Sequence, residues 1–310
     1  MIGLDAKALR GSYPPVITPF RAGKIDFETF AKLLERQAAE GSHGVLITGT
    51  TAEPSSLTID ERAQLIEVAV ETLGGRLPIV AATGSQSLAE TLELSSRAEK
   101  AGVDALLVVT PYYIRPPQAG LVEYFVEVGR RTSLPLMVYH IPGRAAVSVT
   151  ATTLARIAER TPNLVGMKHA VNDLEAVTEI LARLGPEFRI FCGLEALSLP
   201  MLTVGAAGLM NAVGNLAPGR VAAMCNAVDR GDLVEARRLH NELFELNQAI
   251  FLDTNPIPLK YMMARLGLID APEVRLPLVP ITDDRGKSLE AVLQRAGLSP
   301  MMLQSAGKHS

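Results

Sequence analysis

The chain has 310 residues, of which 48% are hydrophobic and 20% charged, and its net charge is −3 at pH 7. This length accommodates one large domain or two smaller ones, and the weak negative charge argues against a nucleic-acid partner. Residues 1–15 carry charges and no long apolar core, so we expect no signal peptide. The two cysteines, Cys192 and Cys225, lack metal-ligand spacing and suit a reducing compartment, which favours a cytoplasmic protein.

The sequence predicts eight short strands that alternate with helices. Each strand is a nearly continuous apolar run bounded by turn residues, which is typical of a parallel sheet covered by helices. The strands are expected at residues 15–19, 44–49, 78–82, 105–109, 136–140, 164–170, 189–192 and 208–212.

Capping patterns mark several of the intervening helices. Asp26 precedes an amphipathic stretch that ends near Gly41. Thr58 and Glu61 have the spacing of a capping box, and the run Ser87–Glu90 repeats it. These patterns place helices between consecutive strands.

One uncharged segment, residues 196–219, is long enough to raise the question of a membrane span. Prolines, asparagines and glycines interrupt it. We therefore expect a buried helix followed by a buried strand, and no membrane partner.

The alternation of strands and helices predicts an α/β fold, a (β/α)8 TIM barrel, since it fills a length near the ~250 residues typical of that fold. The barrel is expected over residues 1–231 and a C-terminal helical extension over residues 232–310. A doubly wound open sheet is the alternative, but no glycine-rich dinucleotide turn follows the first strand. The extension shows three helix patterns, at 232–251, 255–268 and 287–296, and residues 301–310 are expected to fray.

The sixth predicted strand contains Lys168 within an apolar run. Lysine is seldom buried, because removing an ammonium from water is costly. Gly166 and Ala170 share a strand face with Lys168 and would leave room above its amine. Apolar walls would favour the neutral amine, which can attack a carbonyl carbon. The other interpretation is a strand-end lysine that reaches back to solvent.

In a barrel of this kind, residues at the carboxyl ends of the strands point into one shared mouth. The residues expected at these strand ends include a lysine, an arginine and several residues with hydroxyl groups. The set is Thr50, Thr51, Tyr112, Tyr113, Tyr139, Arg144, Lys168, Gly193, Met210 and Asn211.

This set suits imine chemistry on a keto acid. Imine formation by a lysine amine needs a proton shuttle, which a tyrosine phenol supplies if threonine and a second tyrosine relay the protons. Arg144 would hold a carboxylate with its bidentate fork. The backbone amides of Thr50 and Thr51 could hold the carboxylate of a 2-oxo acid.

Each of these residues also has a purely structural interpretation. A lone tyrosine is more often a packing residue, a lone arginine a surface charge, and paired threonines a turn. Their coincidence at the strand ends favours a site. His43, His169 and His240 form no metal-ligand set, and Glu53 is interpreted as a cap of its loop.

Six motifs follow one another through nearly the whole chain. They are Gly49-Thr50-Thr51-Ala52-Glu53, Pro111-Tyr112-Tyr113, Tyr139-His140-Ile141-Pro142-Gly143-Arg144, Gly166-Met167-Lys168, Asn255-Pro256-Ile257-Pro258-Leu259-Lys260 and Arg275-Leu276-Pro277. In this order they resemble the motifs of the dihydrodipicolinate synthase/N-acetylneuraminate lyase family.

The resemblance implies a class I Schiff-base lyase that acts on pyruvate or another 2-oxo acid without a metal or organic cofactor. It places the imine on Lys168, the proton relay on Tyr139, Thr50 and Tyr113, and the pyruvate carboxylate at Thr50 and Thr51. Members are usually homotetramers, and in many of them the residue matching Tyr113 reaches into a neighbouring subunit's site.

The synthase branch of the family implies two further roles. Arg144 would hold the carboxylate of aspartate semialdehyde at the mouth of the barrel, and the carbonyl of Met210 would line the site. The presence of Arg144 speaks against a sialic-acid lyase, whose corresponding loop lacks it.

The sequence departs from the synthase pattern at several positions. Ala52 replaces a glycine, and His140 and His169 replace an asparagine and a glutamate beside the tyrosine and the lysine. Further departures are Ile114, Ala145-Ala146 and, where feedback-regulated synthases bind lysine, Ile59, Arg62 and Gln86. We therefore expect no strong inhibition by lysine.

The favoured function is a lyase that condenses pyruvate with an aldehyde, most simply aspartate semialdehyde in lysine biosynthesis. A second hypothesis keeps the imine but makes the chain an aldolase or dehydratase of a 4-hydroxy-2-oxo acid from sugar or aromatic catabolism. A third is a non-enzymatic sensor of 2-oxo acids, against which the intact relay residues argue.

Overall fold

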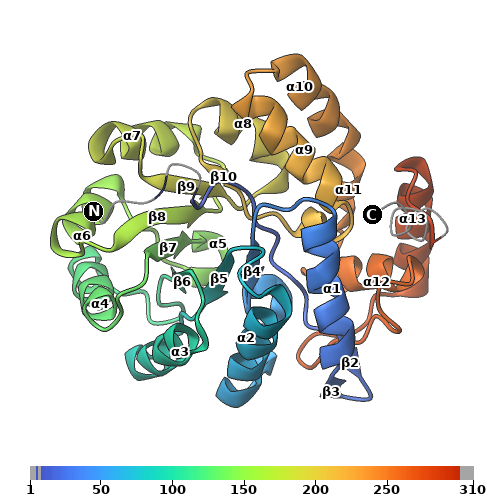
Figure 1. Cartoon of the computed structure of the whole chain (residues 1–310), viewed down its shortest axis with the longest axis horizontal. Helices are drawn as coiled ribbons and strands as arrows, with labels where there is room; N and C mark the ends of the chain where they lie inside the picture. Colours follow the sequence, from blue (N-terminus) through green and yellow to red (C-terminus); the bar gives the residue numbers. More distant parts are fainter. Residues whose placement is uncertain (1–4, 6–7, 301–310) are drawn as a thin grey trace.

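Eight parallel strands form the centre of the molecule and helices surround them (Figure 1). The computed structural model describes residue 5 and residues 8–300, so the segment 301–310 that was expected to fray lies outside the described residues. The barrel strands are β1 (Gly11–Ser12), β4 (Val45–Ile47), β5 (Ile79–Ala82), β6 (Ala105–Val109), β7 (Leu136–His140), β8 (Leu164–His169), β9 (Arg189–Cys192) and β10 (Gly208–Leu209).

Hydrogen bonds between neighbouring strands run around the whole ring. The order is β1-β10-β9-β8-β7-β6-β5-β4, and Pro15 closes the ring through a parallel bridge to Leu46. There the Val16 N–H donates to the Leu46 carbonyl at 3.0 Å, and the Leu46 N–H donates to the Pro14 carbonyl at 3.0 Å. The predicted TIM barrel is therefore confirmed.

The first strand lies earlier than predicted. Of the expected run at 15–19, only Pro15 pairs with another strand, and the paired strand β1 is Gly11–Ser12. Prolines at both ends of the expected run cannot donate to a ladder, which limits its pairing. Gly11 has a φ of +86°, and an added Cβ would come within 2.4 Å of the His43 ring, so only glycine fits there.

The helices fill the positions expected between the strands. Those of the barrel are α1 (Phe27–Ala39), α2 (Ile59–Leu73), α3 (Leu88–Ala101), α4 (Gln118–Arg130), α6 (Ala151–Arg160), α7 (Leu174–Leu184), α8 (Ser198–Thr203) and α9 (Pro218–Asp229), with the short α5 (Pro142–Ala145) after β7. A two-stranded hairpin, β2 (Phe20–Arg21) and β3 (Lys24–Ile25), precedes α1.

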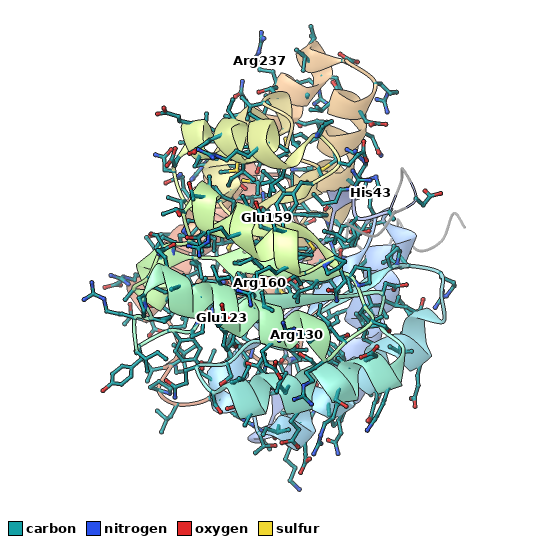
Figure 2. The ribbon with its side chains drawn as sticks, turned by 90° about the vertical axis from the view of Figure 1, so that its left-hand side faces the viewer. His43, Glu123, Arg130, Glu159, Arg160 and Arg237 are labelled. Carbon is teal, nitrogen blue, oxygen red and sulfur yellow. The ribbon has the colours of Figure 1, made fainter. Side chains whose placement is uncertain are left out.

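The outer faces of the barrel helices carry charged side chains, as Figure 2 shows for α4 and α6. Arg160 on α6 forms a two-pronged ion pair with Glu123 on α4. Both side chains are exposed, so this pair adds little to stability. The adhesion of the helices to the barrel comes instead from the apolar side chains beneath them.

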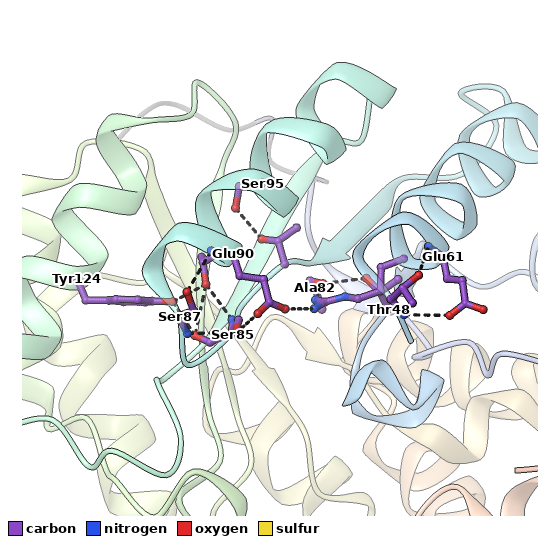
Figure 3. Close-up of polar contacts among 12 residues, drawn as sticks. Thr48, Glu61, Ala82, Ser85, Ser87, Glu90, Ser95 and Tyr124 are labelled. Carbon is purple, nitrogen blue, oxygen red and sulfur yellow. Dashed lines mark hydrogen bonds and ion pairs between the residues drawn. The ribbon is translucent and has the colours of Figure 1, made fainter. Parts of the chain in front are cut away.

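The predicted helix caps are mostly confirmed. The Asp26 side chain accepts the Thr29 N–H, and Thr58 and Glu61 form a reciprocal capping box. The second predicted box is only half made. Ser87 accepts the Glu90 N–H at 3.4 Å, but the Glu90 carboxylate turns away to other partners (Figure 3).

Two apolar layers hold the barrel together. One lies between the strands and the helices, and a smaller one fills the barrel interior, where Tyr13 and Phe191 meet edge to face at 5.2 Å. Tyr139 and Met210 belong to this inner layer. Because side chains alternate along a strand, Tyr139 faces the barrel interior and His140 faces the helices.

The C-terminal extension contains α10 (Leu233–Glu242), α11 (Phe244–Ala249), α12 (Ile257–Arg265) and α13 (Asp283–Arg295). The first of the three predicted helices is thus divided into two. The break is at Leu243, whose ψ of −8° departs from the helical value of about −42°. The bend keeps Leu239, Leu243 and Leu246 buried on one side. We propose that the boundary between barrel and extension lies near Gly231, as the sequence predicts.

The uncharged segment 196–219 contains α8 and β10, both short, as expected of a buried helix followed by a buried strand. No helix within the described part of the chain is long and apolar enough to cross a membrane.

The close approach of β8 and β9 yields a first prediction. A Cβ added to Gly166 would lie 2.2 Å from the Arg189 carbonyl oxygen, a backbone atom that cannot move freely. We expect Gly166→Ala to lower the free energy of unfolding, measured by urea denaturation, by about 2 kcal/mol or more. Gly143→Ala is the matched control, because nothing lies within 4 Å of its added Cβ. Equal stability of the two variants would contradict this account.

Candidate active site

A cavity of about 570 Å³ opens at the carboxyl ends of the strands. Its walls come from the loops after β4, β5, β6 and β7 and from the C-terminal extension. The lining residues with polar side chains include Thr50, Glu53, Arg62, Glu90, Tyr112, Tyr139, Arg144, Asn255 and Arg275.

Lys168 lies near the end of β8 with only 4% of its surface exposed. Its Nζ is 4.6 Å from the centre of the Tyr139 ring, on the ring face. Within the described part of the chain, the amine makes no hydrogen bond or ion pair. Tyr139 lines the cavity and Lys168 does not, so the amine lies one side chain away from the open space.

The room for the lysine side chain is provided by Gly193, after β9. A Cβ at this position would lie 2.8 Å from the Lys168 Cε and 3.3 Å from its Cγ. Gly166, which the sequence suggested for this role, instead faces the backbone of β9. Gly193 therefore matters because it has no side chain, which leaves space for Lys168.

The predicted proton relay is only partly assembled in a single chain. The hydroxyl oxygens of Thr50 and Tyr139 are 3.5 Å apart, longer than the usual O–H···O hydrogen bond. Tyr113 is 84% exposed and does not line the cavity. Its φ of +71° turns the loop outward, and its neighbour Ile114 is also exposed, at 60%. The structure thus brings Thr50 and Tyr139 together and leaves Tyr113 on the surface.

Thr50 and Thr51 begin a 3-10 turn after β4. Their two backbone N–H groups have no hydrogen-bond acceptor among the described residues. The Thr51 hydroxyl is buried and accepts a bond from the Asn255 side-chain amide at 3.0 Å. The turn therefore offers backbone donors, while the Thr51 side chain is used to hold the loop.

The remaining predicted residues differ in their access to the cavity. Arg144 on α5 is exposed and lines the cavity, and its side chain makes no ion pair or hydrogen bond with the described residues. Met210 is buried in the inner apolar layer, and its N–H donates to the Cys192 carbonyl at 2.9 Å. The Arg144 guanidinium is thus free to receive an anion, whereas Met210 does not line the cavity.

A buried carboxyl group near Lys168 was not predicted. Glu195, two residues after Gly193, is 3% exposed. One of its oxygens accepts the Ala212 N–H at 2.6 Å, and the other has no partner in the described structure. Burial raises the pKa of Glu195 to about 7, although the Ala212 N–H and the Lys168 cation act in the opposite direction. Glu195 is therefore a buried carboxyl group with a raised pKa, within range of electrostatic interaction with Lys168.

Two histidines for which no common role was predicted form a buried pair. His140 and His169 directly follow Tyr139 and Lys168, and their Nδ1 atoms are 3.3 Å apart. Neither residue lines the cavity. Burial lowers the pKa of His140 to about 4, and His169 adds to this shift while Asp173 opposes it. Burial also lowers the pKa of His169. The pair is therefore uncharged near neutral pH.

The histidine pair predicts acid sensitivity. An unfolded histidine titrates near pH 6.5, so between pH 6.5 and 4 the unfolded chain binds more protons than the folded one. We expect His140 to remove about 3 kcal/mol from the free energy of unfolding as the pH falls from 7 to 4. Urea denaturation at each pH measures this. His140→Asn should flatten the dependence, and an unchanged slope would contradict the assignment.

Arg62, one of the positions that depart from the pattern of feedback-regulated synthases, lines the cavity. It is 5% exposed, donates to the Ala82 carbonyl at 3.0 Å and lies 3.6 Å from the Glu90 carboxylate. Glu90 in turn accepts from the Ser85 hydroxyl at 3.0 Å, in the polar cluster of Figure 3. Because the Glu90 carboxylate is already paired with Arg62, it is less available to bind the ammonium group of an effector such as lysine.

Taken together, a buried amine against a tyrosine face, with free backbone donors and an unpaired arginine side chain at the barrel mouth, is the arrangement that imine chemistry on a carbonyl substrate requires. The model of the dihydrodipicolinate synthetase family matches residues 8–296. The 4-hydroxy-tetrahydrodipicolinate synthase of Thermus thermophilus is 44% identical over 298 residues, which cover 96% of this chain and 99% of that protein.

Solved structures agree with the sequence match. The 4-hydroxy-tetrahydrodipicolinate synthase of Methylacidiphilum fumariolicum SolV superimposes with a TM-score of 0.91 at 37% identity, over 96% of this chain and 99% of that one. A monomeric dihydrodipicolinate synthase variant gives 0.91 at 34% identity, over 96% and 100%. The chain belongs to the dihydrodipicolinate synthetase family. The predicted family and the predicted enzyme class, a lyase of the class I aldolase type, are confirmed.

Proposed function

We propose that the chain condenses pyruvate with aspartate semialdehyde, the reaction of 4-hydroxy-tetrahydrodipicolinate synthase. The observation that carries this proposal is the buried Lys168 amine on the face of Tyr139. The full-length relatives that bear this enzyme's name support the choice of reaction.

In the proposed reaction, the Lys168 nitrogen bonds to the keto carbon of pyruvate and the keto oxygen leaves as water. Tyr139 passes the protons, with Thr50 as its neighbour in the relay. Loss of a methyl proton turns the imine into an enamine, whose carbon attacks the aldehyde. The free amides of Thr50 and Thr51 would bind the pyruvate carboxylate, and Arg144 the carboxylate of aspartate semialdehyde.

Gly193 and Met210 take supporting roles in this proposal. Gly193 makes the space that the lysine needs, and Met210, which is buried in the inner apolar layer, would line the site with its carbonyl. Tyr113 would join the relay only from a neighbouring copy of the chain, because in its own chain it lies on the surface. A homotetramer and a cytoplasmic location stay predictions of the sequence.

The second hypothesis, an aldolase or dehydratase of a 4-hydroxy-2-oxo acid, was based on the altered residues that flank the lysine and follow the arginine. His169, beside the lysine, is buried and does not line the cavity, which weakens the first part of that argument, whereas Ala145, directly after Arg144, does line the cavity. The sensor hypothesis gives no reason for an amine held against a tyrosine at the barrel mouth.

Borohydride trapping tests the proposal. After incubation with pyruvate and reduction, mass spectrometry should find the adduct on the peptide that contains Lys168, since only an imine is reduced to a stable amine. Lys168→Ala should give none, and Lys100→Ala, at an exposed lysine on α3, should leave the yield unchanged. Absence of an adduct on folded protein would rule out pyruvate as the imine partner.

Arg144 allows the two substrates to be separated. We expect Arg144→Met to raise the KM for aspartate semialdehyde at least tenfold, roughly the loss of one charge-assisted contact. The pyruvate concentration for half-maximal trapping should change less than about twofold. Arg130→Met, at an exposed position on α4, is the matched control. An equal loss for both substrates would show that Arg144 does not select the aldehyde.

A further inference from the structure

The loop after β4 is fixed in place from the opposite end of the sequence. Its residue Glu53 is 5% exposed, and its carboxylate meets the ammonium of Lys260, which is fully buried on α12, at 2.5 Å. The other Glu53 oxygen accepts the backbone N–H of Arg275 at 3.1 Å. Lys260 also donates to the Glu273 carbonyl at 2.7 Å. The carboxylate therefore has a partner from the extension on each oxygen.

The surroundings of this ion pair are built to hold it. Lys260 Nζ lies 4.1 Å from the centre of the Phe20 ring, and the Arg275 guanidinium carbon lies 4.5 Å from it. Arg275 also forms a bidentate pair with Glu61 on α2, at 2.8 and 2.9 Å. A charge pair this deeply buried is costly unless its geometry and its remaining hydrogen bonds are satisfied, and here they are.

The loop itself is in a conformation that needs such support. Thr48 and Glu53, at its two ends, have φ values of +56° and +59°, which are unfavourable for residues other than glycine. Between them lie Thr50 and Thr51, with the two free amides. A second contact from the extension, from Asn255 to the Thr51 hydroxyl, holds the middle of the loop.

We propose that Lys260 and Glu53 are positioning residues for pyruvate. This ion pair holds the 49–53 loop so that the Thr50 and Thr51 amides are positioned for the pyruvate carboxylate and the Thr50 hydroxyl for Tyr139. The C-terminal extension is thereby part of the active site, although its buried lysine never touches substrate. This inference rests on the proposed function for its substrate, but not for its effect on the loop.

Two measurements on the full-length protein test the proposal. Lys260→Met keeps an unbranched side chain that is one atom shorter and removes the charge. We expect the pyruvate concentration for half-maximal borohydride trapping to rise at least about tenfold, because small displacements of positioning groups have effects of this size. The KM for aspartate semialdehyde should change less than about twofold, since Arg144 does not depend on this loop.

Hydrogen exchange followed by mass spectrometry supplies a readout that needs no substrate. Peptides that cover residues 46–57 should exchange at least about tenfold faster in Lys260→Met, while peptides of α10 should not change. Arg295→Met is the matched control, because it breaks an exposed ion pair within the same extension, Arg295 with Glu245. It should alter neither readout.

A buried carboxylate without its cation could prevent Lys260→Met from folding. Glu53→Gln/Lys260→Met removes both charges and avoids that cost, and it should change both readouts in the same direction. Unchanged loop exchange in a folded variant would overturn the proposal, and so would faster exchange with unchanged pyruvate trapping. If the variant shows faster loop exchange but the wild-type protein never traps pyruvate, the role of Lys260 in holding the loop stands and the proposed function is rejected.

Discussion

The proposed mechanism depends on one constraint: the Lys168 amine is buried inside the barrel and makes no hydrogen bond or ion pair with the described residues. Burial of an amine is unfavourable unless its surroundings compensate, and here the compensation is small. The amine has the face of Tyr139 on one side and no competing hydrogen bond among the described residues. An amine already bound to a carboxylate would be a poorer nucleophile, so this lack of partners is a chemical asset.

That constraint explains the composition of the neighbouring strands. Gly193 directly follows the strand next to Lys168, and any side chain there would collide with the lysine. The buried carboxyl group of Glu195 interacts electrostatically with Lys168 and is held by the Ala212 N–H. The groups that we propose bind substrate are separate from the amine, on the loop after β4 and on α5, where they can be presented without filling the barrel.

The sequence predicted the fold well because each signal was local. Apolar runs marked the strands, and side chains such as Asp26 and Thr58 marked the helix starts. The first strand was misplaced because a two-residue strand that begins with Gly11 leaves no apolar run to detect. The split at Leu243 was missed because both halves keep the same apolar face.

The candidate site was predictable where chemistry is carried by the residue type itself, as for Lys168, Tyr139 and Arg144. It was not predictable where function depends on pairing across the chain. Glu53 and Lys260 are separated by 207 residues, and nothing local signals their contact. Nor does the sequence say that His140 and His169 face each other, or that Tyr113 points away from its own chain's site.

The central claim is that pyruvate binds covalently to Lys168 with its carboxylate on the 49–53 loop. A crystal structure of the protein soaked with pyruvate tests this most directly. The account predicts continuous density from the Lys168 Nζ to the keto carbon, with the carboxylate oxygens at about 3 Å from the N–H nitrogens of Thr50 and Thr51. Pyruvate held without a bond to Lys168, or with its carboxylate on Arg144, would contradict it.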